Sequence, residues 1–240
     1  MNTEIRNANG EKIDYTFHDA GSDVIVAIGH GVTGNKDRPL VVALAEGLAA
    51  AGVSALRFSF AGNGDSEGDF RDATITKEVG DLGAVLDAIE AAGKTAFYAG
   101  HSMGGAVGVT RTSSDDRIKA LISLAGMVDV KKFSDTEFGD GGDCMWEDED
   151  CPLSDTFLND MASIGTVVEL GAKISVPWLL IHGTEDDVVL IEDTHNIFEK
   201  ANDPKQKLVI DGCDHVFSEP EHMKQMVEGA VSWVQNVLNG

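Results

Sequence analysis

The chain has 240 residues, enough for one well-buried domain, and 42% of them are hydrophobic, which excludes general disorder. Its 41 acidic and 18 basic side chains give a formal net charge of −23. This charge excludes nucleic acid and anionic membranes as partners and disfavours anionic substrates. No apolar run approaches the ~18 residues of a membrane span, and the N-terminus lacks the features of a signal peptide, so we expect a cytoplasmic protein.

Apolar, strand-like runs alternate with helix-like runs along the chain, and this alternation predicts βαβ units with a largely parallel sheet. Several of the strands are continuously apolar, as strands covered on both faces should be. We therefore predict an α/β fold in a single domain over residues 1–240. In chain order we expect a strand at 12–17, a strand at 24–28, a helix at 38–51, a strand at 55–60, a helix at 73–92, a strand at 95–99, a helix at 104–112, strands at 120–125 and 176–181, a helix at 191–201, a strand at 207–210 and a helix at 220–238.

The alternation is interrupted once, at about residues 127–172, where acidic, Gly-rich FGDGGDCMWEDEDCPL precedes helix-like FLNDMASI and TVVELGAK. An insertion after a sheet strand is a natural position for a lid over an active site. We expect Met145, Trp146 and Phe157 of this lid to line an apolar substrate pocket. The alternative is that such side chains only pack the lid onto the sheet. Further candidates of the same kind are Phe133, Phe138, Leu158 and Met161.

The three cysteines are too few for a disulfide framework. Cys144 and Cys151 bracket the acidic loop CMWEDEDC, and in a cytosolic protein we expect free thiols there. The loop supplies too few soft or imidazole ligands for zinc, so no metal site is expected.

The pattern Gly-x-Ser-x-Gly occurs twice, around Ser66 and around Ser102. A nucleophilic serine needs a tight strand-to-helix turn with small neighbours, so that the strand and the helix can approach. The run TAFYAGHSMGGAVGVT at 95–110 supplies an apolar strand, a turn and a small-residue helix start. Ser66 lies in a long polar loop instead. Ser102 is therefore the candidate nucleophile.

The run GHGVTG at 29–34 follows one of the predicted strands and permits two readings. As a dinucleotide-binding fingerprint it would need an acidic residue at the end of the next strand, but that strand is followed by no acid before Asp65. As part of a serine hydrolase, its loop would donate a backbone N–H to an oxyanion hole. We favour the second reading because it shares a mechanism with Ser102.

A nucleophilic serine also needs a base and an acid, which in this arrangement follow it in the order Asp or Glu, then His. Asp186 and Asp187 come just after the strand at 176–181, and His215 follows the strand at 207–210. The carboxyl ends of parallel strands meet at one crevice, so these side chains should converge on Ser102. His30 and His182 flank strand ends and are expected to make structural hydrogen bonds, and His101 is read as the variable position of the serine turn.

Together these segments resemble the α/β-hydrolase superfamily, in particular its serine esterases and lipases, with cinnamoyl (feruloyl) esterases and monoacylglycerol lipase-like enzymes as the most similar members. The resemblance implies that Ser102 is the nucleophile, Asp186 the acid and His215 the base. It further implies that the backbone N–H groups of Val32 and Met103 form the oxyanion hole and that no cofactor is needed. The segments are HGVTGNKD (30–37), LRFSFAGNGDSEG (56–68), GHSMGG (100–105), HGTEDDVV (182–189) and GCDHVF (212–217).

The function expected from these features is hydrolysis of small-molecule carboxylic esters with small or aromatic acyl groups, through an acyl-enzyme. The same residues fit a thioesterase, an amidase or a carbon–carbon hydrolase. Two alternatives come from other functional classes. One is a small-molecule binding protein that retains the three residues, and the other is an oxidoreductase that binds NADPH. The oligomeric state is left open by the sequence, and a homodimer is compatible with it.

Overall fold

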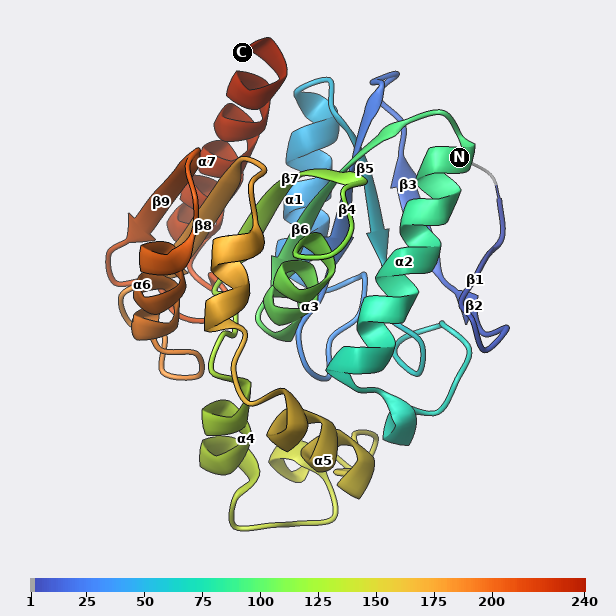
Figure 1. Cartoon of the computed structure of the whole chain (residues 1–240), viewed down its shortest axis with the longest axis vertical. Helices are drawn as coiled ribbons and strands as arrows, with labels where there is room; N and C mark the ends of the chain where they lie inside the picture. Colours follow the sequence, from blue (N-terminus) through green and yellow to red (C-terminus); the bar gives the residue numbers. More distant parts are fainter. Residues whose placement is uncertain (1–2) are drawn as a thin grey trace.

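The structure, a computed structural model, describes residues 3–240 and contains a seven-stranded sheet with helices on both faces (Figure 1). The strand order is β3-β5-β4-β6-β7-β8-β9, in which only β3 is antiparallel to its neighbour. The predicted α/β fold with a mostly parallel sheet is thus observed, apart from residues 1–2, which lie outside the described range. The strands of this sheet are β3 (Tyr15–His18), β4 (Val24–Gly29), β5 (Ser54–Phe58), β6 (Thr95–His101), β7 (Ile118–Leu124), β8 (Trp178–Gly183) and β9 (Lys205–Ile210).

The helices divide between the two faces of the sheet according to where their apolar side chains lie. Helices α1 and α7 share one buried cluster with the sheet, and α2, α3 and α6 share the other. Burial on both faces explains why the central strands read as continuous apolar runs. The helices are α1 (Pro39–Ala50), α2 (Ile75–Ala91), α3 (Met103–Thr112), α4 (Val130–Phe138), α5 (Asp155–Ile164), α6 (Ile191–Lys200) and α7 (Pro220–Asn239).

Two of the expected elements differ from those observed. The strand expected at 12–17 is divided into β2 (Lys12–Ile13), which pairs with β1 (Ile5–Arg6), and β3. The division falls at Asp14, whose backbone N–H donates to Ser66 Oγ (2.8 Å) rather than to a neighbouring strand. The run TVVELGAK forms a 3₁₀ segment, η3 (Val168–Lys173), rather than an α-helix.

The insertion between β7 and β8 contains α4, η2 (Met145–Glu147), α5 and η3, and α4 and α5 lie beyond the carboxyl ends of the parallel strands, at the bottom of Figure 1. Its two stems are joined by backbone hydrogen bonds, from Val167 to Val128 (3.0 Å) and from Lys131 to Gly165 (2.7 Å). The part of the insertion between Val128 and Val167 therefore begins and ends at neighbouring points, and η3 then leads to β8. Another 3₁₀ segment, η1 (Phe70–Asp72), lies between β5 and α2.

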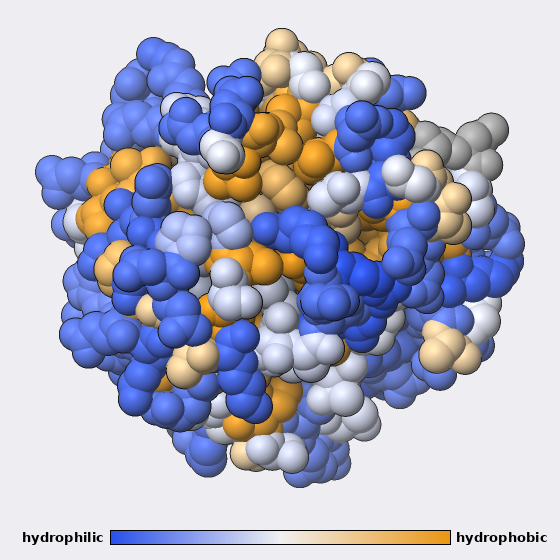
Figure 2. All heavy atoms as spheres, turned by 45° about the horizontal axis from the view of Figure 1, so that its top comes forward, coloured by the Kyte–Doolittle hydropathy of each residue, from blue (hydrophilic) through white to orange (hydrophobic). Residues whose placement is uncertain are grey.

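The surface reflects the acidic composition. Figure 2 shows the face reached by turning the top of Figure 1 forward, where hydrophilic residues dominate and hydrophobic ones are confined to smaller patches. Among residues 3–240 no helix combines the length and the apolar character needed to cross a membrane.

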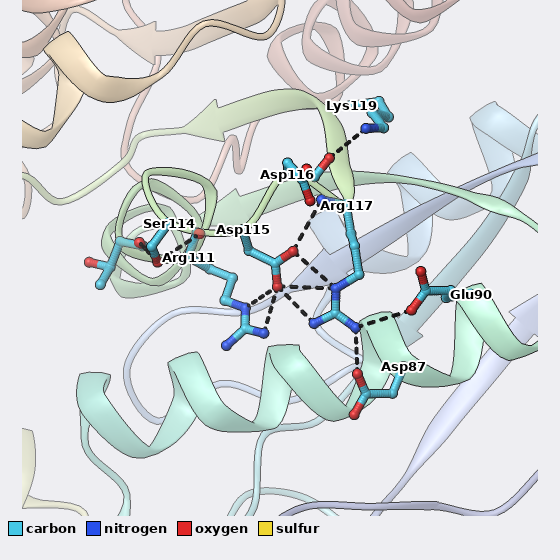
Figure 3. A network of polar contacts seen from close by, with 9 residues as sticks. Asp87, Glu90, Arg111, Ser114, Asp115, Asp116, Arg117 and Lys119 are labelled. Carbon is cyan, nitrogen blue, oxygen red and sulfur yellow. Dashed lines mark hydrogen bonds and ion pairs between the residues drawn. The ribbon is translucent and has the colours of Figure 1, made fainter.

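An ion network ties α2 and α3 to the start of β7 (Figure 3). Asp115 accepts hydrogen bonds from Arg111 Nε (2.8 Å) and from Arg117 Nη2 (2.7 Å), and Arg117 also pairs with Asp87 and Glu90. Only 10% of the Asp115 side chain is exposed. The hydrogen bonds from Arg117, opposed by burial and aided by Arg111, hold the pKa of Asp115 well below its usual range.

We expect Asp115→Asn to lower the free energy of unfolding by about 1–2 kcal/mol at pH 7, because the two guanidinium groups lose a shared carboxylate in a partly solvated site. A depressed pKa stabilises the fold above the unfolded-state value of about 3.9, and this contribution is lost as the pH falls through the folded-state pKa. The difference between wild type and variant in urea unfolding should therefore be full at pH 7 and shrink below pH 4. The exposed neighbour Asp116 makes no ion pair among the described residues, so Asp116→Asn is the control, and an equal loss in both variants would contradict the prediction.

Candidate active site

Ser102 occupies the tight turn between β6 and α3, with φ 53° and ψ −119°. A positive φ is strained for a non-glycine residue and persists only where its surroundings hold it. Here the Ser102 N–H donates to the Leu124 carbonyl (3.0 Å), and the Ser102 carbonyl accepts from Gly105 (2.8 Å) and Met127 (3.0 Å). These bonds attach the turn to β7 and to the start of the insertion.

Two glycines let the loop after β4 approach this turn. A Cβ at Gly104 would lie 2.5 Å from the His30 carbonyl oxygen, and one at Gly31 would lie 2.8 Å from Ser102 Cβ. Both distances are too short for a real side chain. The small residues of GHSMGG and GHGVTG thus have a common cause, which is the close contact of two loops beside the Ser102 hydroxyl.

His215 and Asp186 form a hydrogen-bonded pair at the neighbouring strand ends. His215 Nδ1 donates to Asp186 Oδ2 (2.8 Å), while Asp186 Oδ1 accepts from the backbone of Val188 (3.0 Å) and Val189 (2.9 Å). Asp187, the other candidate, is exposed and has no hydrogen bond to His215. The structure thus brings Asp186 rather than Asp187 to the histidine.

The electrostatics of Asp186 are set by its hydrogen bonds. Burial acts to raise the pKa of Asp186, but hydrogen bonds from His182 and His215 outweigh it and hold this pKa far below its ordinary value. The His182 ring is fully buried and also contacts the Val189 carbonyl (2.8 Å) and the Thr194 hydroxyl (2.8 Å). Asp186 is therefore a fixed carboxylate that orients His215, and His182 makes the structural hydrogen bonds expected of it.

The two expected oxyanion donors lie in the two loops that meet beside Ser102. Met103 is the first residue of α3, where backbone N–H groups have no partner within the helix. Val32 lies in the loop after β4 and lines the same cavity as Ser102. Within residues 3–240 neither backbone N–H donates to another protein group. Both are therefore free to bind a ligand oxygen.

Ser102 and His215 line one cavity of about 540 Å³, within the size range of small-molecule sites. Of the three lid residues expected there, Trp146 lines the cavity, whereas Met145 and Phe157 are each 2% exposed and belong to the buried core. Phe133 of α4 lines it instead of them. The predicted substrate contacts of Met145 and Phe157 therefore fall outside the cavity wall, because both side chains are buried in the core, where Phe157 packs against Phe138.

His101 makes a contact with His215 that the sequence analysis did not predict. Its Nε2 donates to the His215 carbonyl (2.9 Å), and the two rings lie 4.7 Å apart, centroid to centroid. Burial, with the nearby His215 adding to it, lowers the pKa of His101 to about 3, so this ring is neutral. The position inside the serine turn thus also supports the histidine loop.

We expect His101→Leu to lower kcat about tenfold with little change in KM, because losing one hydrogen bond to a buried carbonyl lets His215 shift. His101→Gln keeps an N–H donor and should recover most of the loss. Steady-state kinetics on one ester substrate would check this. A KM effect, or no recovery with Gln, would contradict the positioning role.

The two remaining sequence motifs have structural roles in the fold. Ser66 Oγ donates to the Ser59 carbonyl (2.7 Å) and accepts from Asp14, so this second Gly-x-Ser-x-Gly serine holds a loop. The run GHGVTG does not open a helix, since α1 begins only at Pro39. A dinucleotide-binding fingerprint requires such a helix start, so that reading fails. Within the described part of the chain, no cluster of three His, Cys, Asp or Glu is placed to bind a metal ion.

The sequence model of the prolyl oligopeptidase family matches residues 45–240. The chain belongs to the prolyl oligopeptidase family. With this assignment, the resemblance to α/β-hydrolases is confirmed, and the protein is a serine hydrolase of the α/β-hydrolase fold. The chain matches no curated protein sequence.

Solved structures share the fold of this prolyl oligopeptidase family member over its whole length. Est1E from Butyrivibrio proteoclasticus, solved with ferulic acid bound, has a TM-score of 0.88 at 22% identity and covers 99% of this chain and 100% of its own. Mouse α/β-hydrolase domain-containing protein 10 has a TM-score of 0.81 at 18% identity, with 98% of each chain covered. The esterase Pf2001 of Pyrococcus furiosus has a TM-score of 0.78 at 20% identity and covers 98% of this chain and 91% of its own. At these identities the likeness establishes the fold.

Proposed function

We propose that this protein hydrolyses carboxylic esters with small or aromatic acyl groups, with Ser102 as nucleophile, His215 as base and Asp186 as orienting acid. The observation that carries the proposal is that Ser102 and His215 line one cavity, while the Asp186 carboxylate accepts a hydrogen bond from Nδ1 of His215 behind it. This arrangement of roles is the one that acyl transfer requires.

The hydrogen bond to Asp186 decides which ring nitrogen reacts. With Nδ1–H donated to the carboxylate, Nε2 of His215 carries the lone pair that accepts the Ser102 proton. Ser102 Oγ then bonds to the ester carbonyl carbon, and the C=O electron pair moves to oxygen. The backbone N–H groups of Val32 and Met103 would bind this oxyanion, and one such donor is typically worth about 3–4 kcal/mol.

The second half of the cycle returns the enzyme to its starting state. The tetrahedral intermediate collapses with loss of the alcohol, which takes the proton from His215. Water then gives a proton to His215 and attacks the acyl-enzyme carbonyl. The new intermediate expels Ser102 Oγ, which regains its proton, and the carboxylic acid leaves. The charge on His215 is compensated at each step by the ionised Asp186.

The cavity supports a small or aromatic acyl group. Its volume of about 540 Å³ suits a small organic molecule, and its walls include the aromatic rings of Phe133 and Trp146. Trp146 is held by a hydrogen bond from its Nε1 to Glu137 (2.8 Å) and by Phe138, whose ring centroid lies 5.0 Å away. The ferulic acid bound in the related fold of Est1E is an aromatic acid of this size class.

The test is hydrolysis of p-nitrophenyl esters of increasing acyl length, together with methyl ferulate. We expect kcat/KM to be highest for short acyl or feruloyl esters and to fall at least about tenfold at twelve carbons, if the aromatic walls select small or planar acyl groups. Failure to cleave any ester, or a preference for the long chains, would overturn the proposal.

Hydrolysis of amide bonds is the second candidate, and the family match favours it. The same triad chemistry cleaves esters and amides, so the residues do not separate them. Acyl p-nitroanilides matched in acyl group to the best ester decide the question. If the anilide acylates the enzyme faster than the ester does, the protein is an amidase rather than an esterase.

A further inference from the structure

The charge lining the cavity is opposite in sign to the charge of the chain. Of 240 residues 41 are acidic, which would place about three among the eighteen that line the cavity, yet none of the eighteen is Asp or Glu. His30 and His101 are neutral there, because burial above all lowers their pKa values to about 4 and about 3. Among the described residues that line the cavity, Arg38 is the only one with a permanently charged side chain.

Arg38 also differs from every other arginine in the chain. Five of the six arginines have a carboxylate oxygen within 4 Å, and within residues 3–240 Arg38 has none. The adjacent carboxylate of Asp37 is bound to Lys36 and Arg57 instead. In a chain with more than two acids for each base, an arginine without a carboxylate partner is a marked exception.

The guanidinium of Arg38 is oriented by one hydrogen bond, from Nη2 to the Thr33 carbonyl (3.0 Å), and both residues line the cavity. Arg38 is exposed, and this bond holds it to the loop that contains Val32. The remaining N–H donors of Arg38 have no protein acceptor among the described residues.

We propose that Arg38 binds a carboxylate carried by the substrate, so that the preferred esters have a negative charge apart from the ester bond itself. This inference rests on the proposed ester hydrolysis. The planar guanidinium fork matches a carboxylate in two parallel hydrogen bonds. A single positive charge in an otherwise uncharged wall suits a monovalent carboxylate better than a phosphate monoester, which carries about −1.5 to −2 at pH 7. This proposal is opposite to the expectation, drawn from the net charge, that anionic substrates are disfavoured.

The test compares mono-p-nitrophenyl glutarate with p-nitrophenyl pentanoate, which differ in the charge at the end of the acyl chain. We expect the ratio of their kcat/KM values to fall about tenfold in Arg38→Gln, mainly through KM, and less in Arg38→Lys, which keeps the charge without the fork. A second pair, 4-acetoxybenzoate and 4-acetoxybenzamide, shows whether the carboxylate is recognised on the alcohol side instead. Arg71→Gln, an exposed arginine outside the cavity, is the matched control and should keep the wild-type ratios.

An unchanged ratio in Arg38→Gln for both pairs, with esters still cleaved, overturns the inference and leaves the proposed function intact. If wild type cleaves no ester, the proposed function fails. Whether Arg38 binds a carboxylate is then decided by measuring ligand binding. In the Ser102→Ala background, calorimetry should show mono-p-nitrophenyl glutarate binding about tenfold more weakly when Arg38→Gln is added. Equal binding in the two proteins would overturn the inference by itself.

Discussion

Ser102→Ala is expected to lower kcat for ester hydrolysis by about 10⁴- to 10⁶-fold, because it removes the hydroxyl that we propose forms the acyl-enzyme. The substitution keeps the turn small enough for the contact with Gly31. Binding of substrate should therefore persist, and KM should change much less than kcat. A short p-nitrophenyl ester and a mass measurement of the acyl-enzyme in wild type would check both parts of the expectation.

The matched control is Ser66→Ala, at the other Gly-x-Ser-x-Gly serine. It removes the hydrogen bonds to Ser59 and Asp14 and is expected to lower the free energy of unfolding by about 1–3 kcal/mol. Its kcat should stay within a few-fold of wild type at a temperature where it remains folded. If the two variants lose activity equally, or if Ser102→Ala retains it, Ser102 is not the nucleophile.

Asp186→Asn is expected to lower kcat about 10⁴-fold, the second largest effect. An asparagine oxygen can still accept the backbone bonds from Val188 and Val189, but its amide then faces His215 as a donor. The His215 ring would respond by carrying its proton on Nε2, the atom that must accept the proton of Ser102. The loss therefore comes from the wrong tautomer rather than from unfolding.

Asp187→Asn separates this explanation from a general effect of charge removal, since both variants change the net charge by one unit. Asp187 is exposed and does not contact His215, so its variant should retain nearly full kcat. The depressed pKa of Asp186 keeps it ionised across the working range, so the wild-type pH profile should show no acid limb from this carboxylate. A profile in which Asp187→Asn is the inactive variant would reassign the acid.

Much of the fold was predictable because burial on two faces produces a strong sequence signal. The strand at 24–28 and the turn around Ser102 are examples, since the first is continuously apolar and the second needs small neighbours. The choice of Asp186 over Asp187 came from the family pattern and not from the residues themselves. Local sequence carries no information about which of two adjacent carboxylates turns inward.

The lid and the charge of the cavity were harder to predict. Phe157 and Trp146 are both aromatic residues of the insertion, yet the first is buried in the core and the second lines the cavity with 47% of its surface exposed. Their difference depends on irregular backbone, including the positive φ of Trp146 (50°), for which the sequence gives no periodic signal. The contact of His101 with His215 joins segments more than a hundred residues apart, and the lack of a carboxylate partner for Arg38 depends on which segments surround it, so no pattern along the chain could reveal either feature.

The insertion can be replaced as a unit, because its two ends are hydrogen-bonded to each other. Because Val128 and Val167 are hydrogen-bonded to each other, the chain between them begins and ends at neighbouring points, and replacing it would leave both sheet attachments in place. Ser102, Asp186, His215 and Arg38 all lie outside that segment, whereas Phe133 and Trp146 lie within it. Evolution or engineering can therefore vary part of the cavity wall by substituting one stretch of about forty residues, while the proposed catalytic residues and the proposed carboxylate-binding arginine stay unchanged.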